Sequence, residues 1–75
     1  MVTKQTHYAL PNRSFMVDRQ FFNFDNLCYS VCLLTFGYYD EKGKLCYIYH
    51  LLLDGVFTIA FSDYAGVLGY LQKLA

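Results

Sequence analysis

The sequence predicts a small α+β domain, in which a three-stranded antiparallel β-meander is followed by a C-terminal helix. Two turn signals divide the middle of the chain into three segments rich in aliphatic and aromatic residues, and the last segment carries apolar residues at helical spacing. Seventy-five residues suffice for one domain, so we assign residues 1–75 to a single domain.

The N-terminal segment has the weakest pattern. Residues 1–12 are predicted to be irregular, whereas Ser14 is a suitable N-cap for a short helix over residues 14–24. One face of this helix would carry Phe15, Arg19 and Phe22. The same segment also alternates as a strand, with one side formed by Phe15, Val17, Arg19 and Phe21. We favour the helix, which gives the element order αβββα.

The strongest local signal is the Asp54-Gly55 pair between two apolar runs. Both residue types tolerate the positive φ angles of a type I′ turn, so the pair predicts a tight β-hairpin. Its strands are expected at residues 45–53 and 56–61.

A second turn is predicted in the charged segment at residues 40–44. Gly43 suits the left-handed position of a three-residue hairpin loop, which makes residues 27–39 the first strand of the meander. A helix capped by Asp25 is the alternative for this segment. The β-branched and aromatic content of the segment favours the strand.

The final segment predicts a helix over residues 63–74. Ser62 is a good N-cap, and Lys73 lies where the negative end of the helix dipole favours a cation. The apolar stripe consists of Tyr64, Val67, Leu68, Leu71 and Leu74. Gly66 and Gly69 lower the helix propensity, and we expect their lack of side chains to let the helix approach the sheet closely.

The two turns fix a register and therefore the two faces of the sheet. With loops of two and three residues, Leu53 pairs with Val56 and Tyr38 pairs with Cys46. The face expected to form the core under the helices holds Cys32, Leu34, Phe36, Cys46, Ile48, His50, Leu52, Phe57, Ile59 and Phe61. On that face we expect His50 to be a neutral, buried histidine with a lowered pKa.

The opposite face carries tyrosines and threonines among aliphatic residues. Two short helices cannot cover both sides of a sheet, so this face is expected to remain available to a partner unless the N-terminal segment folds over it. Tyrosine combines apolar area with a hydroxyl group and is enriched at protein interfaces. The predicted interface consists of Val31, Leu33, Thr35, Tyr39, Tyr47, Tyr49, Leu51 and Thr58.

Residues that carry chemistry are scattered along the chain. No nucleotide-binding, nucleophile-elbow, HExxH or EF-hand motif is present, so we predict no catalytic residues and no cofactor. Cys28, Cys32 and Cys46 do not have the spacing of zinc ligands, and an odd number of cysteines does not form a disulfide framework. We therefore predict no metal site, and we expect three buried thiols in a reducing cytoplasm.

Charge and hydropathy limit the classes of partner. Six basic residues balance six acidic ones, which argues against a nucleic-acid-binding module, although tyrosines on an open sheet are able to stack on bases. A membrane span is not expected either, because the longest apolar stretches are too short or are interrupted by His50 and Asp54. Nucleic-acid binding and membrane association remain the two alternatives to a protein partner.

We therefore predict a non-enzymatic interaction module that binds a protein partner or a second copy of itself. Apolar residues make up 56% of the chain and charged residues only 16%, so the small core cannot hold all of the apolar surface, and a complex would cover the remainder. In size and composition the chain is similar to inhibitors and adaptors carried by phages and other mobile elements.

Overall fold

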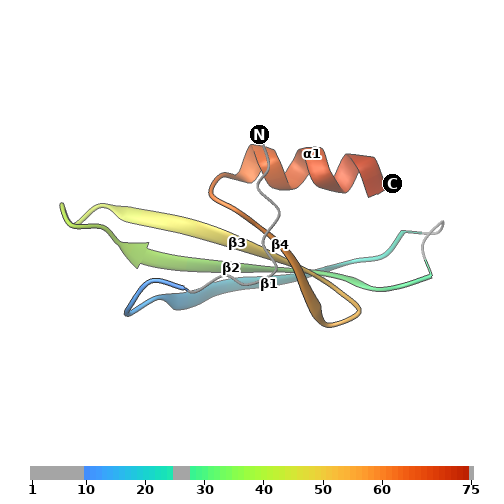
Figure 1. Ribbon diagram of the computed structural model, residues 1–75, viewed down its shortest axis with the longest axis horizontal. Helices are drawn as coiled ribbons and strands as arrows, with labels where there is room; N and C mark the ends of the chain where they lie inside the picture. The colour runs from blue at the N-terminus through green and yellow to red at the C-terminus, as the bar shows by residue number, and fades with distance from the viewer. Residues whose placement is uncertain (1–9, 25–27, 75) are drawn as a thin grey trace.

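The computed structural model describes residues 10–24 and 28–74, which form an antiparallel sheet with a helix on one side (Figure 1). The elements are β1 (Phe15–Phe22), β2 (Val31–Tyr39), β3 (Leu45–Leu53), β4 (Val56–Phe61) and α1 (Tyr64–Leu74). The strand order is β1-β2-β3-β4, so each strand pairs with its neighbours in sequence. The fold is of the predicted α+β class, with four strands in place of three and one helix in the described ranges.

Both predicted hairpins are present. Asp54 and Gly55 have φ angles of 54° and 78°, the positive values that a tight turn of this kind requires. Gly43 in the loop between β2 and β3 has a φ of 78°, as expected for its left-handed position. The strands predicted at residues 45–53 and 56–61 are confirmed.

The loop between β2 and β3 is organised by Asp40. Its Oδ1 atom accepts hydrogen bonds from the backbone N–H of Lys44 at 2.8 Å and of Lys42 at 2.9 Å. The N–H of Gly43 donates to the backbone carbonyl of Asp40 at 3.0 Å. The bond from Lys44 is the largest cause that lowers the pKa of the Asp40 carboxyl, because it stabilises the ionised form.

The prediction of a helix over residues 14–24 is wrong. The segment forms strand β1 and pairs with β2 in an antiparallel manner. The segment adopts the alternative strand structure because it then forms hydrogen bonds with the backbone groups along one edge of β2. A helix at these residues would leave those backbone groups unpaired. β1 contains a bulge at Val17, between the paired residues Met16 and Asp18.

β2 begins at Val31, later than the predicted start at residue 27. Residues 25–27 and the predicted irregular segment 1–9 lie outside the described residues. Just before β2, Ser30 forms two hydrogen bonds with Asp54 in the turn between β3 and β4, and each residue donates one of them. The N–H of Ser30 donates to Oδ1 of Asp54 at 3.2 Å, and the N–H of Asp54 donates to the carbonyl of Ser30 at 2.9 Å.

α1 follows β4 directly and lies over β3 and β4. Asp63 rather than Ser62 caps the helix, because its Oδ1 accepts a hydrogen bond from the N–H of Gly66 at 2.8 Å. Lys73 lies in the last turn, as expected.

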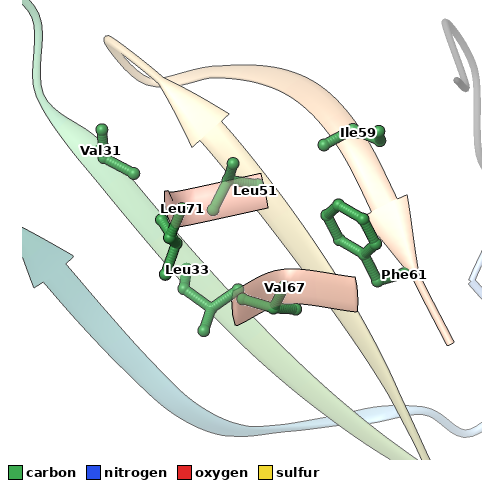
Figure 2. Close-up of a cluster of buried hydrophobic side chains, with 7 residues drawn as sticks. All are labelled: Val31, Leu33, Leu51, Ile59, Phe61, Val67 and Leu71. Atoms are coloured by element: carbon green, nitrogen blue, oxygen red, sulfur yellow. The ribbon is translucent and has the colours of Figure 1, made fainter. Parts of the chain in front are cut away.

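The main core lies between α1 and one face of the sheet (Figure 2). Its buried side chains are Val31, Leu33, Leu51, Ile59, Phe61, Val67 and Leu71. The partly buried side chains around them are Phe22, Phe24, Tyr29, Tyr49, Leu53, Tyr70 and Leu74. This cluster therefore joins β2, β3, β4 and α1.

α1 packs on the face that was predicted to remain open, so the assignment of the two faces is wrong. The predicted register of β3 and β4 holds as far as Leu52, but Leu51 pairs with Ile59, which leaves Thr58 as an extra residue in β4. Because side chains alternate, the extra residue moves Ile59 and Phe61 to the face of Leu51. That face gains two large apolar side chains and becomes the core.

The glycines of α1 differ in their surroundings. A Cβ atom on Gly66 would lie only 2.7 Å from Cδ1 of Phe61, so the helix does approach the sheet closely at this point. A Cβ atom on Gly69 would have nothing within 4 Å. The expected role in close packing is confirmed for Gly66 and wrong for Gly69.

Candidate protein-interaction surfaces

The face of the sheet opposite α1 is called the open face. Side chains alternate between the two sides along each strand, and paired residues on neighbouring strands share a side. The residues that alternate with the core residues along β1 to β4 therefore point to this face. It consists of Met16, Arg19, Phe21, Cys32, Leu34, Phe36, Tyr38, Cys46, Ile48, His50, Leu52, Phe57 and Ala60. In the part of the chain that the structure describes, α1 is the one helix, and it lies on the other side (Figure 1).

Neighbouring side chains pack closely at the centre of the open face. Ile48 and Cys32 are only 4% and 9% exposed although neither belongs to the cluster under α1. The ring of His50 lies between Phe36 of β2 and Phe57 of β4, with centroid distances of 5.1 Å and 4.9 Å and edge-to-face geometry. The face therefore has an aromatic centre held in place by contacts across three strands.

His50 is the titratable group at this centre. Burial lowers its pKa, because the charged imidazolium loses hydration among apolar neighbours. The predicted lowered pKa is thus supported, but the predicted place beneath a helix is not. As a neutral ring, His50 adds no formal charge to the open face at neutral pH.

β1 forms the rim of the open face. Phe21 and Met16 are 66% and 52% exposed. The guanidinium carbon of Arg19 lies 5.7 Å from the centroid of the Phe21 ring, within the range of a cation–π contact. With His50 neutral, Arg19 is the one formal charge among the open-face residues.

The residues of the predicted interface are divided between the core and the surface. Val31, Leu33 and Leu51 are 0%, 1% and 0% exposed in the cluster under α1, so they are core residues and cannot contact a partner. Tyr39 and Tyr47 are 63% and 39% exposed.

The other three residues of the predicted interface are partly buried. Thr35 lies within β2, and the Thr58 hydroxyl donates to the carbonyl of Val56 at 3.1 Å. The ring of Tyr49 lies 5.6 Å from that of Tyr64 and packs against the core. Burial is the largest cause of the raised pKa of Tyr49.

The accessible part of the tyrosine-bearing face is called the distal aromatic patch. It consists of the exposed sheet residues Phe15, Val17, Tyr39, Leu45 and Tyr47. The rings of Phe15 and Tyr39 lie 6.2 Å apart, and Gly37 leaves room for Phe15, since a Cβ atom on Gly37 would lie 2.9 Å from Cζ of that ring. The hairpin of β2 and β3 extends beyond α1, which leaves this patch uncovered by the helix (Figure 1).

The described residues hold no group of three or more His, Cys, Asp or Glu side chains arranged to bind a metal ion. Cys32 is buried and Cys46 half-buried, but Cys28 is exposed, so the expectation of three buried thiols is wrong for Cys28. Among residues 10–24 and 28–74, no helix has the length and apolar content to cross a membrane.

Comparison of the chain with protein-family models, with curated proteins and with solved structures finds no match. The functional interpretation therefore depends on the open face and the distal aromatic patch.

The sequence predicted β2, β3 and β4 of the open face, but it predicted β1 as a helix and placed the pairing of β3 with β4 correctly only as far as Leu52. Eight of the open-face residues were placed on one face and assigned to the core, together with Ile59 and Phe61, which lie on the other side. The decisive feature is the bulge at Thr58, and no glycine or other turn residue in β4 indicates it. The exposed positions of Tyr39 and Tyr47 follow from the predicted hairpin alone.

Proposed function

We propose that the chain is a non-enzymatic protein-interaction module that acts through its open face. The observation that supports this proposal is an apolar sheet face opposite α1 that bears one formal charge, that of Arg19. Met16 and Phe21 are exposed at its β1 rim, the other apolar residues of this face are half-buried or buried, and interface centres are depleted in charge. An adaptor that bridges proteins and an inhibitor that occludes one would both use such a surface.

The packing of the open face suits it for binding without rearrangement. Phe36, His50 and Phe57 hold one another by edge-to-face contacts, and Ile48 is nearly buried beside them. Side chains that are already ordered lose little conformational entropy when a partner covers them. Less of the favourable free energy of burying this face would therefore be offset by lost side-chain entropy than for a face with mobile side chains.

The tyrosines retain a proposed role at the edge of the same complex. Tyr39 and Tyr47 belong to the distal aromatic patch, which lies on the opposite side of the β2–β3 hairpin from the open face. A partner that wraps around this hairpin would contact both surfaces. Contacts by Tyr39 and Tyr47 stay a prediction.

Nucleic-acid binding is the less favoured candidate. Aromatic side chains on an exposed sheet can stack on bases, but Phe36 and Phe57 direct their contacts toward the ring of His50. Binding of phosphates requires several cations, and the open face provides only Arg19. We expect no band shift with single-stranded DNA or RNA at low salt.

Site-specific photo-crosslinking tests the proposed surface. A photoreactive benzoylphenylalanine in place of Phe36 should form covalent adducts with a protein when cells that produce this chain are irradiated. The matched control places the same group at Leu68, which is 46% exposed on α1, and should form none. The absence of adducts from position 36, or adducts from position 39 in place of 36, would refute the open face as the binding surface.

A further inference from the structure

We infer that the outer edge of β1 binds an extended segment of a different protein, which joins the sheet as a further strand beside β1. The bound segment places an acidic side chain opposite Arg19 and a basic side chain opposite Asp18. This inference rests on the proposed function, because it names the form in which a protein partner contacts the rim of the open face.

β1 is an edge strand. It is the first strand in the order β1-β2-β3-β4, and among the strands and the helix of the described residues it contacts only β2. All but one of its eight residues are exposed. Alternate residues of an antiparallel edge strand point their backbone N–H and C=O groups away from the sheet. The outer edge of β1 therefore presents a row of donors and acceptors that another extended backbone complements.

Exposed apolar side chains lie on both sides of β1. Met16 and Phe21 belong to the open face, whereas Phe15 and Val17 belong to the distal aromatic patch on the opposite side. A partner laid flat on one face would leave the pair on the other face uncovered. A strand added at the edge sends alternate side chains to both sides of the sheet, so it packs beside both pairs. The distribution of exposed apolar residues therefore favours an added strand.

The bulge at Val17 confines the regular part of the edge to Asp18–Phe22. This stretch pairs with Val31–Thr35 of β2 without a shift in register, so its outer backbone groups have the regular spacing that a new strand needs. Bulges and charged side chains hinder indiscriminate pairing at sheet edges. β1 has both, and an incoming strand therefore has to match the charges of Asp18 and Arg19.

These two charges favour an unlike strand over a second copy of this chain. Asp18 and Arg19 are neighbours and pair with successive residues of β2, so their side chains lie on opposite sides of the sheet. Because paired residues share a side, two antiparallel copies of β1 cannot place Asp18 opposite Arg19. Arg19 is exposed and contacts the ring of Phe21, which leaves its guanidinium accessible to a carboxylate. A strand with adjacent acidic and basic residues complements both charges at once.

The order of side chains in the bound segment follows from the same alternation. In an antiparallel segment read from its N-terminus, an apolar residue beside Phe21 is followed two positions later by the acidic residue beside Arg19. The next residue is the basic one beside Asp18. The partner therefore supplies an extended segment with the order apolar, any residue, acidic, basic.

An NMR titration of the isotope-labelled full chain tests this edge, with the peptide acetyl-Thr-Ile-Val-Thr-Glu-Lys-Thr-amide as the probe. Binding should slow hydrogen exchange at alternate amides of Asp18–Phe22 and leave the amides of α1 unchanged. A control peptide with its Glu and Lys exchanged should bind at least about 10-fold more weakly, because like charges then lie opposite each other. The double variant Asp18→Lys with Arg19→Glu, altered only at exposed positions, should reverse this preference.

Two further peptides separate backbone pairing from side-chain contact. They carry N-methyl groups on alternate backbone nitrogens, in the two possible phases, and have the same side chains as the probe. The phase that blocks the N–H groups facing β1 should lose binding, and the other phase should retain it. Equal affinity of the two phases, or of the probe and its charge-exchanged control, would overturn the inference.

The same measurement identifies other occupants of the edge. Slow exchange of these amides in the dilute chain without peptide would show that the chain covers its own edge. Slow exchange that appears only as the concentration of the chain rises would make a second copy the occupant, and either result would overturn the inference. Failure of the probe to bind, while position 36 still crosslinks to a protein in cells, would refute the added strand and leave the proposed function intact. Failure of both would refute both.

Discussion

The two glycines of α1 allow a matched test of how closely the helix packs on the sheet. Gly66→Ala and Gly69→Ala make the same chemical change in one helix, and the structure predicts effects of opposite sign. Glycine within a helix costs up to about 1 kcal/mol relative to alanine, so either substitution gains up to this amount in helix propensity. The difference between them comes from what the new methyl group meets.

At Gly69 the methyl group meets nothing within 4 Å, so the propensity gain remains and the free energy of unfolding should rise by about 0.5–1 kcal/mol. At Gly66 it would lie 2.7 Å from Cδ1 of Phe61, and that ring must move by roughly 0.8 Å to restore a normal carbon–carbon contact. Phe61 is 7% exposed and its ring lies 5.8 Å from that of Tyr70, so it cannot swing into solvent. Overpacking of this kind costs about 1–3 kcal/mol, which leaves Gly66→Ala about 0–2 kcal/mol less stable than the wild type.

Thermal unfolding followed by circular dichroism at one fixed protein concentration measures both effects, because association would shift the midpoint. A change of 1 kcal/mol corresponds to about 4–8 °C in a domain of this size. Phe61→Leu should remove the clash, so Gly66→Ala made in that background should no longer destabilise. A Gly66→Ala variant as stable as Gly69→Ala would show that the close packing of α1 on Phe61 is wrong.

Three further changes test the core, the β2–β3 turn and the open face. Leu51→Ala should lower the free energy of unfolding in urea by about 2–5 kcal/mol, because it leaves a cavity at a side chain that is 0% exposed. Asp40→Asn should lower Tm measured by calorimetry, because a neutral amide oxygen accepts the two N–H bonds from the loop less strongly than a carboxylate. Burial lowers the pKa of His50 below its ordinary value of 6.5, so folding disfavours its protonation. Stability measured across pH should therefore be fully present above about 6.5 and should fall as the pH decreases through the folded pKa of His50.

Each of these changes has its own control. Leu68→Ala, at a side chain that is 46% exposed, should change the free energy of unfolding by less than about 0.5 kcal/mol. A cost below about 1 kcal/mol for Leu51→Ala would contradict the burial beneath α1. An unchanged Tm for Asp40→Asn would show that the loop does not depend on the carboxylate. His50→Leu should reduce the loss of stability between pH 6.5 and 5, and an identical pH profile would assign that loss to another group.

The local elements could be predicted wherever short-range sequence imposes one backbone geometry. Asp54-Gly55 and Gly43 require positive φ angles, which fixed both hairpins and two of the strands. The segment at residues 14–24 has patterns for both a helix and a strand, and its outcome depends on pairing with the edge of β2, which lies outside the segment. Local propensity could not decide between them.

The candidate surfaces also combine features that the local sequence predicts with features that depend on the tertiary structure. The exposure of Tyr39 and Tyr47 follows from their place beside the β2–β3 turn, which the sequence predicts. The burial of Val31, Leu33 and Leu51 does not, because it depends on the side of the sheet to which α1 returns. As a result, the aliphatic residues of the predicted interface are core residues, Tyr49 packs against the core, and Tyr39 and Tyr47 are exposed.

The sequence by itself determined the two turns, the pairing of β2 with β3, the C-terminal helix and the excess of apolar side chains over what a small core can hold. Only the tertiary structure decided which face of the sheet becomes the core. The physical reason is that one extra residue at Thr58 reverses the direction of every later side chain in β4 and brings Ile59 and Phe61 to the side of Leu51. The bulge lets Ile59 and Phe61 join Val67 and Leu71 of α1 in the buried cluster, and no local pattern around Thr58 specifies these contacts between segments.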